Sequence, residues 1–239
     1  MVRDGLSERL RRIEERLAAT CARSGRDPAE IRIVAVTKGH PQSAIVDALE
    51  AGLRDIGENR VGEATEKFSA ASTALKSHGA IRHMVGHLQR NKVRDAVTAF
   101  DWVQSVDSVR LAQALSRRMV EAGAALPILV EVNAGGEEQK HGFRPEEAVD
   151  RAAEIGEMPG LSLRGLMTMA PLSEDESVLR ATFQSARRLF ERLIALRGRS
   201  EPVPDTLSMG MSGDYTLAIE EGSTMLRLGT ILFGTRSGD

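Results

Sequence analysis

The sequence predicts an α/β protein folded as a single (β/α)8 barrel of the TIM type, with one additional helix at its N-terminus. Eight short runs rich in aliphatic and β-branched residues alternate with helical or turn segments, a pattern typical of parallel sheets. The 239 residues of the chain are close to the usual size of a single barrel, about 250 residues. An open doubly wound sheet is the alternative, but no GxGxxG motif follows the first strand and no linker divides the chain into two lobes. We therefore expect one domain over residues 1–239.

The leading helix is predicted over residues 1–24, because Leu6, Leu10, Ile13 and Leu17 recur at spacings of three and four among charged residues. Asp27 and Pro28 predict the turn that follows. The barrel is expected over residues 31–234. Apolar runs bounded by turn residues predict its strands at 31–38, 53–59, 81–86, 101–106, 127–133, 161–169, 205–210 and 224–234. The intervening segments predict helices at 41–52, 60–75, 88–99, 107–123, 145–156, 175–197 and 213–222.

Composition excludes several classes of protein. The net charge of −2 and the 3% aromatic content argue against a nucleic-acid binder, which needs a basic field or a base-stacking surface. No apolar run is long enough for a membrane span, and the charged N-terminus lacks the apolar core of a signal peptide. The single cysteine, Cys21, fits a reducing compartment. We therefore expect a cytoplasmic protein that contacts neither membrane nor nucleic acid.

Lys38 is the most informative of the five lysines. It ends the apolar run VAVTK, where the side chain would point into the mouth of the barrel, the usual place for chemistry in this fold. A partly desolvated lysine can form a Schiff base with an aldehyde. A strand-end lysine that extends its ammonium group to solvent is the alternative. Lys67, Lys76 and Lys92 lie in polar helical stretches and are interpreted as solvated surface cations.

Two glycine-containing turns predict a phosphate site after the seventh and eighth strands. The segments are Ser208-Met209-Gly210-Met211-Ser212 and Leu228-Gly229-Thr230. Loops at these strands often bind phosphate in barrel enzymes, through backbone N–H groups and hydroxyls. Two ordinary turns are the alternative interpretation. Arg227 shares a strand face with Gly229 and would reach a cofactor there, unless it pairs with an internal carboxylate such as Glu58 or Glu131.

The sequence contains no spacing motif for a metal site or for a serine hydrolase. The histidines at 40, 78, 83, 87 and 141 share no metal-ligand spacing, and neither HExxH nor CxxC occurs. We therefore expect no metal site. A Ser-His-Asp hydrolase is disfavoured because GxSxG is absent.

The chain resembles the pyridoxal phosphate (PLP) homeostasis protein family along nearly its whole length. The resemblance is carried by VAVTK (34–38), GEN (57–59), HMVGHLQRNK (83–92), VNAGGEEQKHGF (132–143), RGLMTMAP (164–171), SMGMSGDYTLAI (208–219) and STMLRLGTILFG (223–234). It implies a single barrel similar to the N-terminal domain of alanine racemase. It also implies that PLP is held as an internal aldimine on Lys38, with cytoplasmic localisation and a monomeric state.

The resemblance also implies roles for individual residues. Ser208, Gly229 and Thr230 would hold the phosphate, Arg227 would face the pyridine nitrogen, and Asn59 and His83 would line the cofactor pocket. Met209 and Met211 would lie close by as backbone or packing contacts. Two stretches depart from the family pattern. Arg60-Val61-Gly62 stands where Tyr-x-Gln is usual, and His87 and Arg90 stand where Pro and Ser are common. These departures affect contacts at the rim of the site.

An arginine at the pyridine nitrogen bears on mechanism. An arginine is already protonated and cannot accept the proton of the pyridine nitrogen, so it favours the unprotonated ring, which stabilises a carbanion less well. Many PLP enzymes instead place a carboxylate there, which keeps the nitrogen protonated. Racemases of similar fold add a second base, a tyrosine, but the only tyrosine here, Tyr215, lies in a helix and is interpreted as a surface or packing residue. We therefore expect a PLP carrier without assigned catalytic residues. It would exchange PLP by transimination at Lys38, with apo-PLP enzymes as acceptors.

Two alternatives remain at this point. One is a small PLP enzyme with weak amino-acid racemase activity, and the other is a barrel that binds a different phosphorylated metabolite. Lys140, in the loop after the fifth predicted strand, could act as an accessory amine during cofactor exchange, or it could be a plain surface lysine.

Overall fold

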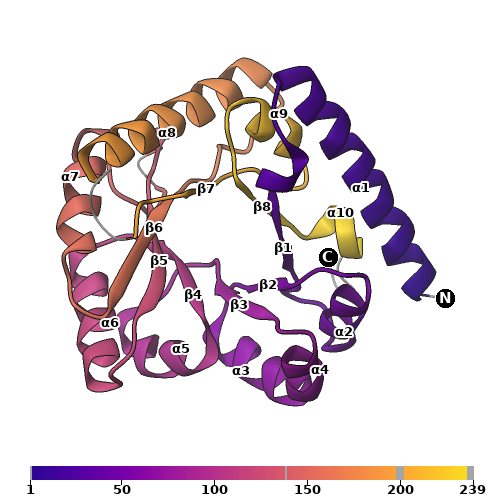
Figure 1. Cartoon of the computed structure of the whole chain (residues 1–239), viewed down its shortest axis with the longest axis horizontal. Helices are drawn as coiled ribbons and strands as arrows, with labels where there is room; N and C mark the ends of the chain where they lie inside the picture. The colour runs from indigo at the N-terminus through magenta and orange to yellow at the C-terminus, as the bar shows by residue number, and fades with distance from the viewer. Residues whose placement is uncertain (1, 138, 198–201, 236–239) are drawn as a thin grey trace.

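The computed structural model describes residues 2–137, 139–197 and 202–235, and its eight parallel strands form a closed barrel in sequence order. Figure 1 looks down the barrel, with the strands at the centre and helices around them. The barrel closes where β8 pairs with β1, with Arg227 opposite Val34. The strands are β1 (Arg32–Val36), β2 (Asp55–Glu58), β3 (Ile81–Met84), β4 (Trp102–Val106), β5 (Leu126–Glu131), β6 (Leu161–Met167), β7 (Thr206–Ser208) and β8 (Met225–Leu228). The predicted fold is confirmed.

Helices follow the strands as the sequence predicts, with differences at their ends. They are α1 (Val2–Ser24), α2 (Ser43–Glu50), α3 (Val61–Ala70), α4 (Ser72–Ser77), α5 (Val93–Ala99), α6 (Val109–Glu121), α7 (Pro145–Gly156), α8 (Glu176–Arg197), α9 (Tyr215–Glu220) and α10 (Thr230–Phe233). Short 3-10 turns precede β1 (Pro28–Glu30) and α5 (Arg90–Lys92). Several predicted strands run past the observed ones because their last residues belong to the loops at the mouth of the barrel. In the last predicted run, 224–234, the strand ends at Leu228 and Thr230–Phe233 form α10, a helix that was not predicted. None of the helices in the described ranges is long and apolar enough to cross a bilayer.

The helix predicted over 60–75 is divided in two at Ala71. Neither proline nor glycine marks the break; instead the two halves pack on different neighbours, α3 against α5 and α4 against α2. Phe68 of α3 makes an edge-to-face contact with Phe100, with ring centroids 5.6 Å apart, and Leu75 of α4 is buried in the same outer core. Tertiary packing therefore overrides a continuous helical pattern here.

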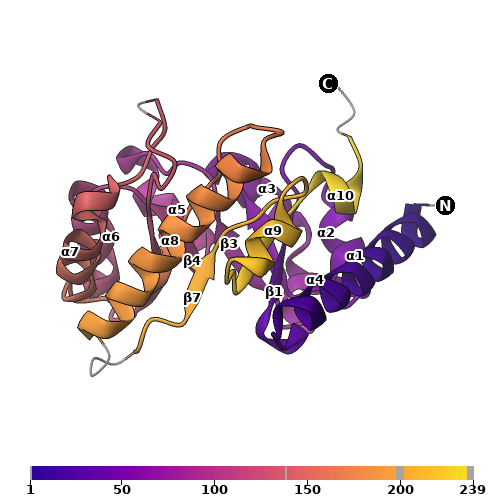
Figure 2. The same cartoon turned by 90° about the horizontal axis from the view of Figure 1, so that it is seen from above.

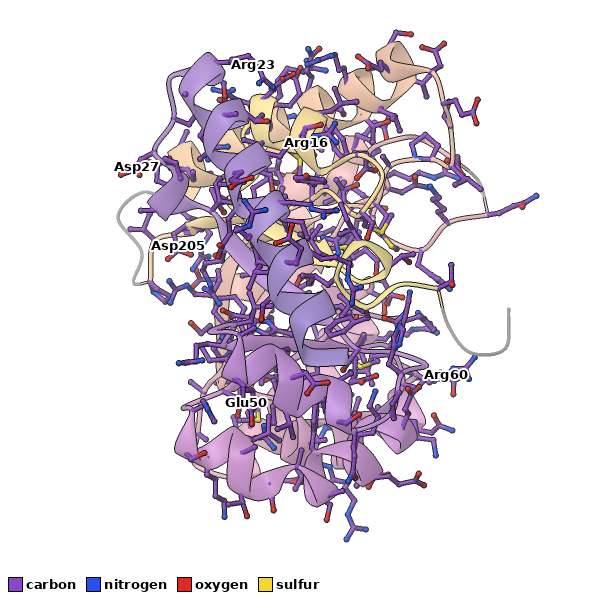
Figure 3. The ribbon with its side chains drawn as sticks, turned by 90° about the vertical axis from the view of Figure 1, so that its right-hand side faces the viewer. Arg16, Arg23, Asp27, Glu50, Arg60 and Asp205 are labelled. Carbon is purple, nitrogen blue, oxygen red and sulfur yellow. The ribbon has the colours of Figure 1, made fainter. Side chains whose placement is uncertain are left out.

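Helix α1 covers the outside of the barrel beside α9 and α10 (Figure 1). Its apolar stripe is buried, and Arg9 Nε donates a 2.6 Å hydrogen bond to the carbonyl oxygen of Leu232. Arg16 lies 5.9 Å from the ring centroid of Tyr215. Figure 3 shows Arg16 and Arg23 along this helix. Met1, the first residue of the predicted helix, lies outside the described residues.

The barrel has a bottom, where strands begin, and a mouth, where they end. Asp27 and Asp205 precede β1 and β7 and lie on one side of the molecule, whereas Arg60 follows β2 and lies on the other (Figure 3). Figure 2 shows the chain segments after β5 and β6 projecting above the mouth. The interior is packed rather than open, with an apolar group formed by Val34, Val36, Val85, Trp102, Leu129, Met167 and Met225.

The interpretation of Lys67 as a solvated surface cation is wrong. Lys67 is only 8% exposed, and its ammonium group reaches from α3 to the buried carboxylate of Glu58. The helical pattern shows that Lys67 shares a face with Val61, Ala64 and Phe68, all buried. A charged residue on that face is stable because it meets a carboxylate inside. Lys76 and Lys92 are exposed as expected.

Candidate functional site

A pocket of about 240 Å³ opens at the mouth of the barrel, between the ends of β1, β2, β3, β6 and β8 and the loop after β7. Six of the sequence-predicted residues line it: Lys38, Asn59, Met211, Arg227, Gly229 and Thr230. The rest of the wall comes from Val36, Val85, Met169, Ser212 and Gly213. The pocket thus combines an amine, a guanidinium group and a glycine-hydroxyl loop at the end of the barrel where this fold places its chemistry.

The residues on either side of Lys38 are held by hydrogen bonds from the neighbouring β2–α3 unit. Thr37 donates from Oγ1 to Glu58 Oε1 at 2.6 Å, and its carbonyl oxygen accepts from Lys67 Nζ at 2.6 Å. The backbone N–H of Gly39 donates to Glu63 Oε1 at 2.7 Å. Lys38 itself is half-buried. Its backbone is therefore held on both sides, so the direction in which the amine enters the pocket is constrained.

Arg227 is 4% exposed and is held by two hydrogen bonds inside the barrel. Nη1 donates to Ser208 Oγ at 2.7 Å and Nη2 to the carbonyl oxygen of Thr168 at 2.8 Å. Burial lowers the pKa of Arg227 to about 10, although the negative charges of Asp214 and Glu131 oppose that shift. The guanidinium is still a cation at neutral pH. It makes these hydrogen bonds to a hydroxyl and a carbonyl, not to the carboxylates that the sequence offered as alternatives.

Ser208 begins a chain of hydrogen bonds that crosses the interior of the barrel. Its hydroxyl donates to Gln104 Oε1 at 2.7 Å, and Gln104 Nε2 lies 3.0 Å from His83 Nδ1. His83 Nε2 lies 2.7 Å from Asp55 Oδ1. Because the Gln104 amide N–H is a donor, His83 accepts at Nδ1 and donates from Nε2 to the carboxylate. Burial lowers the pKa of His83, against the opposing effect of Asp55, so the neutral ring fits this pattern.

Three sequence-predicted residues therefore lie outside the pocket wall. Ser208 and His83 are fully buried beneath it, in the chain that ends on Arg227. Met209 is buried in the outer core, between strands and helices. Direct contact of these residues with a cofactor remains a prediction. Ser212, which the sequence analysis left out of the cofactor-binding set, is on the wall.

The loop after β7 and the start of α10 form a cluster of hydrogen-bond donors. Ser212 Oγ accepts from the backbone N–H groups of Gly229 and Ile231, at 3.4 and 3.2 Å. A side chain at Gly229 would place its Cβ 3.3 Å from the carbonyl oxygen of Val36, inside the wall of the pocket. Gly210 has a φ of +96°, and a Cβ there would lie 2.6 Å from that of Ala218. Gly210 therefore lets the loop pack closely on α9, whereas Gly229 leaves this part of the pocket wall without a side chain.

Glu131, at the end of β5, is a buried carboxyl group that the sequence analysis considered only as a possible partner of Arg227. It is 3% exposed. Burial raises its pKa to about 7; the charge of Asp107 adds to that shift and the charge of Arg227 opposes it. Glu131 is thus the second titratable group within the electrostatic reach of Arg227.

Tyr215 and Lys140 lie outside the pocket wall. Tyr215 is 3% exposed and is part of the outer core, which confirms that it is a packing residue. Lys140 Nζ donates to the carbonyl oxygen of Ala170 at 3.0 Å and forms an ion pair with Glu137. It lines a neighbouring hollow that shares Met169, Met211 and Gly213 with the pocket. Its role as an accessory amine stays a prediction.

A larger hollow of about 760 Å³ lies on the outside of the barrel, between α3 and α5. Its charged residues include Lys92, Arg94 and Asp95. None of the strand-end residues that point to the mouth lines it. We therefore place the candidate site in the smaller pocket.

Comparison with known proteins gives matches that span almost the entire chain. A family model described as alanine racemase, N-terminal domain, matches residues 9–237. The pyridoxal phosphate homeostasis protein of Escherichia coli strain K12 is 38% identical over 231 residues, 97% of each chain.

Two solved structures are also similar over nearly their whole length. A protein of unknown function from Bifidobacterium adolescentis has a TM-score of 0.90 and 37% identity, covering 97% of this chain and 95% of that one. PipY from Synechococcus elongatus PCC7942, solved with PLP bound, has a TM-score of 0.77 and 36% identity, covering 93% of this chain and 100% of PipY.

Proposed function

Because the chain belongs to the alanine racemase N-terminal domain family and, within it, to the pyridoxal phosphate homeostasis proteins, we propose that it binds PLP in the pocket at the barrel mouth. The observation that carries this proposal is the meeting of Lys38, Arg227 and the Gly229–Thr230 turn around one pocket of about 240 Å³. We further propose that residues 1–239 act as one PLP-binding domain, as a monomer in the cytoplasm.

Each part of the pocket matches one part of PLP. The amine of Lys38 suits the aldehyde, with which it condenses with loss of water. The N–H groups of Gly229 and Ile231 and the Ser212 hydroxyl suit the phosphate oxygens. The Arg227 cation suits the pyridine nitrogen, to which an N–H of the guanidinium donates. The N–H groups of Gly229 and Ile231 bond to Ser212 Oγ in the structure, so a phosphate oxygen would take the place of that hydroxyl as their acceptor.

The arginine favours a carrier over an enzyme. A guanidinium group with a pKa of about 10 keeps its proton at neutral pH, so the ring nitrogen stays unprotonated and PLP stabilises a carbanion poorly. Tyr215, the only tyrosine in the chain, packs in the outer core rather than on the pocket wall, so it is not placed as a second base. The function we propose is storage and delivery of PLP. An incoming primary amine, such as the active-site lysine of an apo-PLP enzyme, displaces Lys38 by transimination.

Two measurements test the proposal. PLP added to the purified protein should give the long-wavelength absorbance of a PLP–lysine imine, and Lys38→Ala should abolish it while Lys76→Ala, a change at an exposed lysine, keeps it. The loaded protein should restore the activity of an apo-PLP enzyme. An imine signal that persists in Lys38→Ala would refute the assignment of the amine.

The choice between carrier and enzyme has its own test. Exchange of the α-proton of an amino acid, followed by NMR in D2O, should stay far below ordinary enzyme turnover, about 1–10³ s⁻¹. Exchange in that range would show the protein to be a racemase-like enzyme instead.

A further inference from the structure

Two histidines and an aspartate converge at the mouth of the barrel, outside the wall of the PLP pocket. His87 follows β3, Asp107 follows β4, and His141 lies in the segment between β5 and α7. One nitrogen of each histidine and one carboxylate oxygen of Asp107 all lie within 4.8 Å of one another. The three residues are far apart in sequence, so no spacing motif could reveal them.

The distances among the three side chains match those of a metal centre. His87 Nδ1 lies 2.9 Å from Asp107 Oδ2, and His141 Nδ1 lies 3.8 Å from the same oxygen. Ligand bonds of about 2.0–2.1 Å in a tetrahedron place neighbouring ligand atoms about 3.3–3.4 Å apart. The two observed distances to Asp107 Oδ2 bracket that value, so both histidines already approach the carboxylate at about the spacing of neighbouring metal ligands.

The donor set selects a class of metal. Two imidazole nitrogens suit late first-row divalent ions, whereas Mg²⁺ and Ca²⁺ prefer all-oxygen sites. Three protein ligands leave a fourth position for water. The side chains of His87 and His141 are 40% and 57% exposed, so an ion can enter from solvent. Asp107, at 11% exposure, supplies the inner, negatively charged wall.

The backbone holds two of the three ligands firmly. Asp107 directly follows the last residue of β4. His87 follows Gly86, where a Cβ would lie 2.5 Å from the carbonyl oxygen of Asn59, so the chain is tightly packed at that point. His141 is followed by Gly142, with a φ of +105°, which turns the segment back toward β5. Asp107 and His87 are therefore the two fixed ligands, and His141 belongs to the segment between β5 and α7. Figure 2 shows the segment after β5 projecting above the mouth.

The imidazole rings stack in the structure, with centroids 3.9 Å apart and planes 12° from parallel. Lone pairs in two parallel rings do not converge on one point. Binding of an ion therefore requires one ring to turn about its Cβ–Cγ bond. His141 is the more exposed of the two, so it is the ring with room to turn.

We propose that His87, Asp107 and His141 form a binding site for one divalent transition-metal ion, with Zn²⁺ as its representative. An ion there links the segments that follow β3, β4 and β5. It thereby ties down the loop that also carries Lys140. The proposal does not depend on PLP binding, because none of the three residues lines the PLP pocket.

Calorimetric titration of the untagged, chelator-treated protein with ZnCl2 tests the site. We expect one equivalent of Zn²⁺ to bind, and His87→Ala, His141→Ala and Asp107→Asn each to weaken binding by more than about tenfold. His78→Ala is the matched control, since His78 lies in the turn after α4, where its ring bonds to Ser77 and to the carbonyl oxygen of Ala74. Lys38→Ala should bind Zn²⁺ as the wild type does, which separates this site from the PLP pocket.

Co²⁺ provides a second readout that does not rely on affinity. Intense visible absorbance of the Co²⁺ form would indicate a tetrahedral site, and it should disappear in His87→Ala and be displaced by Zn²⁺. Because His87 and His141 are exposed, we expect circular dichroism to show nearly unchanged melting of their metal-free variants. The proposal is overturned if the His87 and His141 variants bind Zn²⁺ like the wild type, or if His78→Ala or Lys38→Ala removes binding.

Discussion

Lys67 Nζ donates a 2.6 Å hydrogen bond to the carbonyl oxygen of Thr37, the residue that precedes Lys38. The same ammonium group pairs with Glu58, the residue that precedes Asn59. One buried cation therefore links two adjacent pocket segments, through the backbone of one and a side-chain carboxylate of the other. Two of the five lysines thus serve the site in different ways, Lys38 by lining the pocket and Lys67 by positioning it.

We predict that Lys67→Met destabilises the protein and weakens PLP binding. It leaves Glu58 buried without its cation, and breaking a buried ion pair costs about 3–5 kcal/mol. Burial already raises the pKa of Glu58, and loss of Lys67 should raise it further. Urea unfolding and PLP titration measure the two effects, with Lys76→Met as the control. Equal stability of the two variants would contradict this role.

Ser208→Ala should lower the affinities for PLP and for pyridoxal, which has no phosphate, by the same factor. Ser208 lies beneath the pocket and accepts a hydrogen bond from Arg227, so its loss acts through the guanidinium group and not through the phosphate. Loss of one hydrogen bond to a charged group costs about 1.5–3 kcal/mol, or roughly tenfold or more in affinity. Fluorescence or absorbance titrations with both ligands give the ratio. A loss confined to PLP would instead place Ser208 at the phosphate, as the family resemblance implies.

Ser212→Ala should show the opposite selectivity. Ser212 lines the pocket beside the N–H groups of Gly229 and Ile231, where its hydroxyl can donate to a phosphate oxygen. We expect PLP affinity to fall about tenfold and pyridoxal affinity to stay within experimental error. The same two titrations apply. An equal loss for both ligands would show that Ser212 shapes the pocket rather than binding phosphate.

Glu131 should make the stability of the protein depend on pH between about 4.5 and 7. Its pKa is about 7 in the folded protein against the ordinary glutamate value of 4.5, so over this interval the unfolded chain loses the proton while the folded one keeps it. Stability therefore falls as pH rises, by about 3 kcal/mol in total at 1.36 kcal/mol per pKa unit, and levels off above pH 7.

The variant Glu131→Gln lacks this titration. Its stability relative to the wild type should increase from pH 4.5 to 7 by about 3 kcal/mol. Urea unfolding at several pH values, in the presence of a chelator, checks the prediction. A stability difference between the two proteins that is independent of pH would refute it.

Sequence patterns predicted the elements best where local chemistry and packing agree. Pro145 at the first helical position and acidic residues in the first turn mark the start of α7, and its observed bounds equal the predicted 145–156. The break between α3 and α4 was missed because it depends on which neighbours each half contacts. The alternation of β8 placed Arg227 and Gly229 on one face, and both line the pocket.

Site residues were predicted correctly where the position of a residue in its strand determines which way its side chain points. The prediction was incomplete where the orientation of a side chain depends on partners far away in the sequence. Ser208 lies in the predicted motif, yet its hydroxyl bonds to Gln104 and Arg227 from other strands. Lys67 looked like a surface residue because the buried carboxylate it meets lies in another segment.

By itself the sequence determined the barrel, because the order and periodicity of the strands and helices leave few other arrangements. It also determined which strand ends carry the amine, the glycines and the arginine. Only the tertiary structure decided which of these groups share a pocket, how Lys67 and Ser208 support them, and that His87, Asp107 and His141 meet. Those outcomes depend on distances between segments far apart in the chain, and barrel closure sets such distances through the packing of all eight strands.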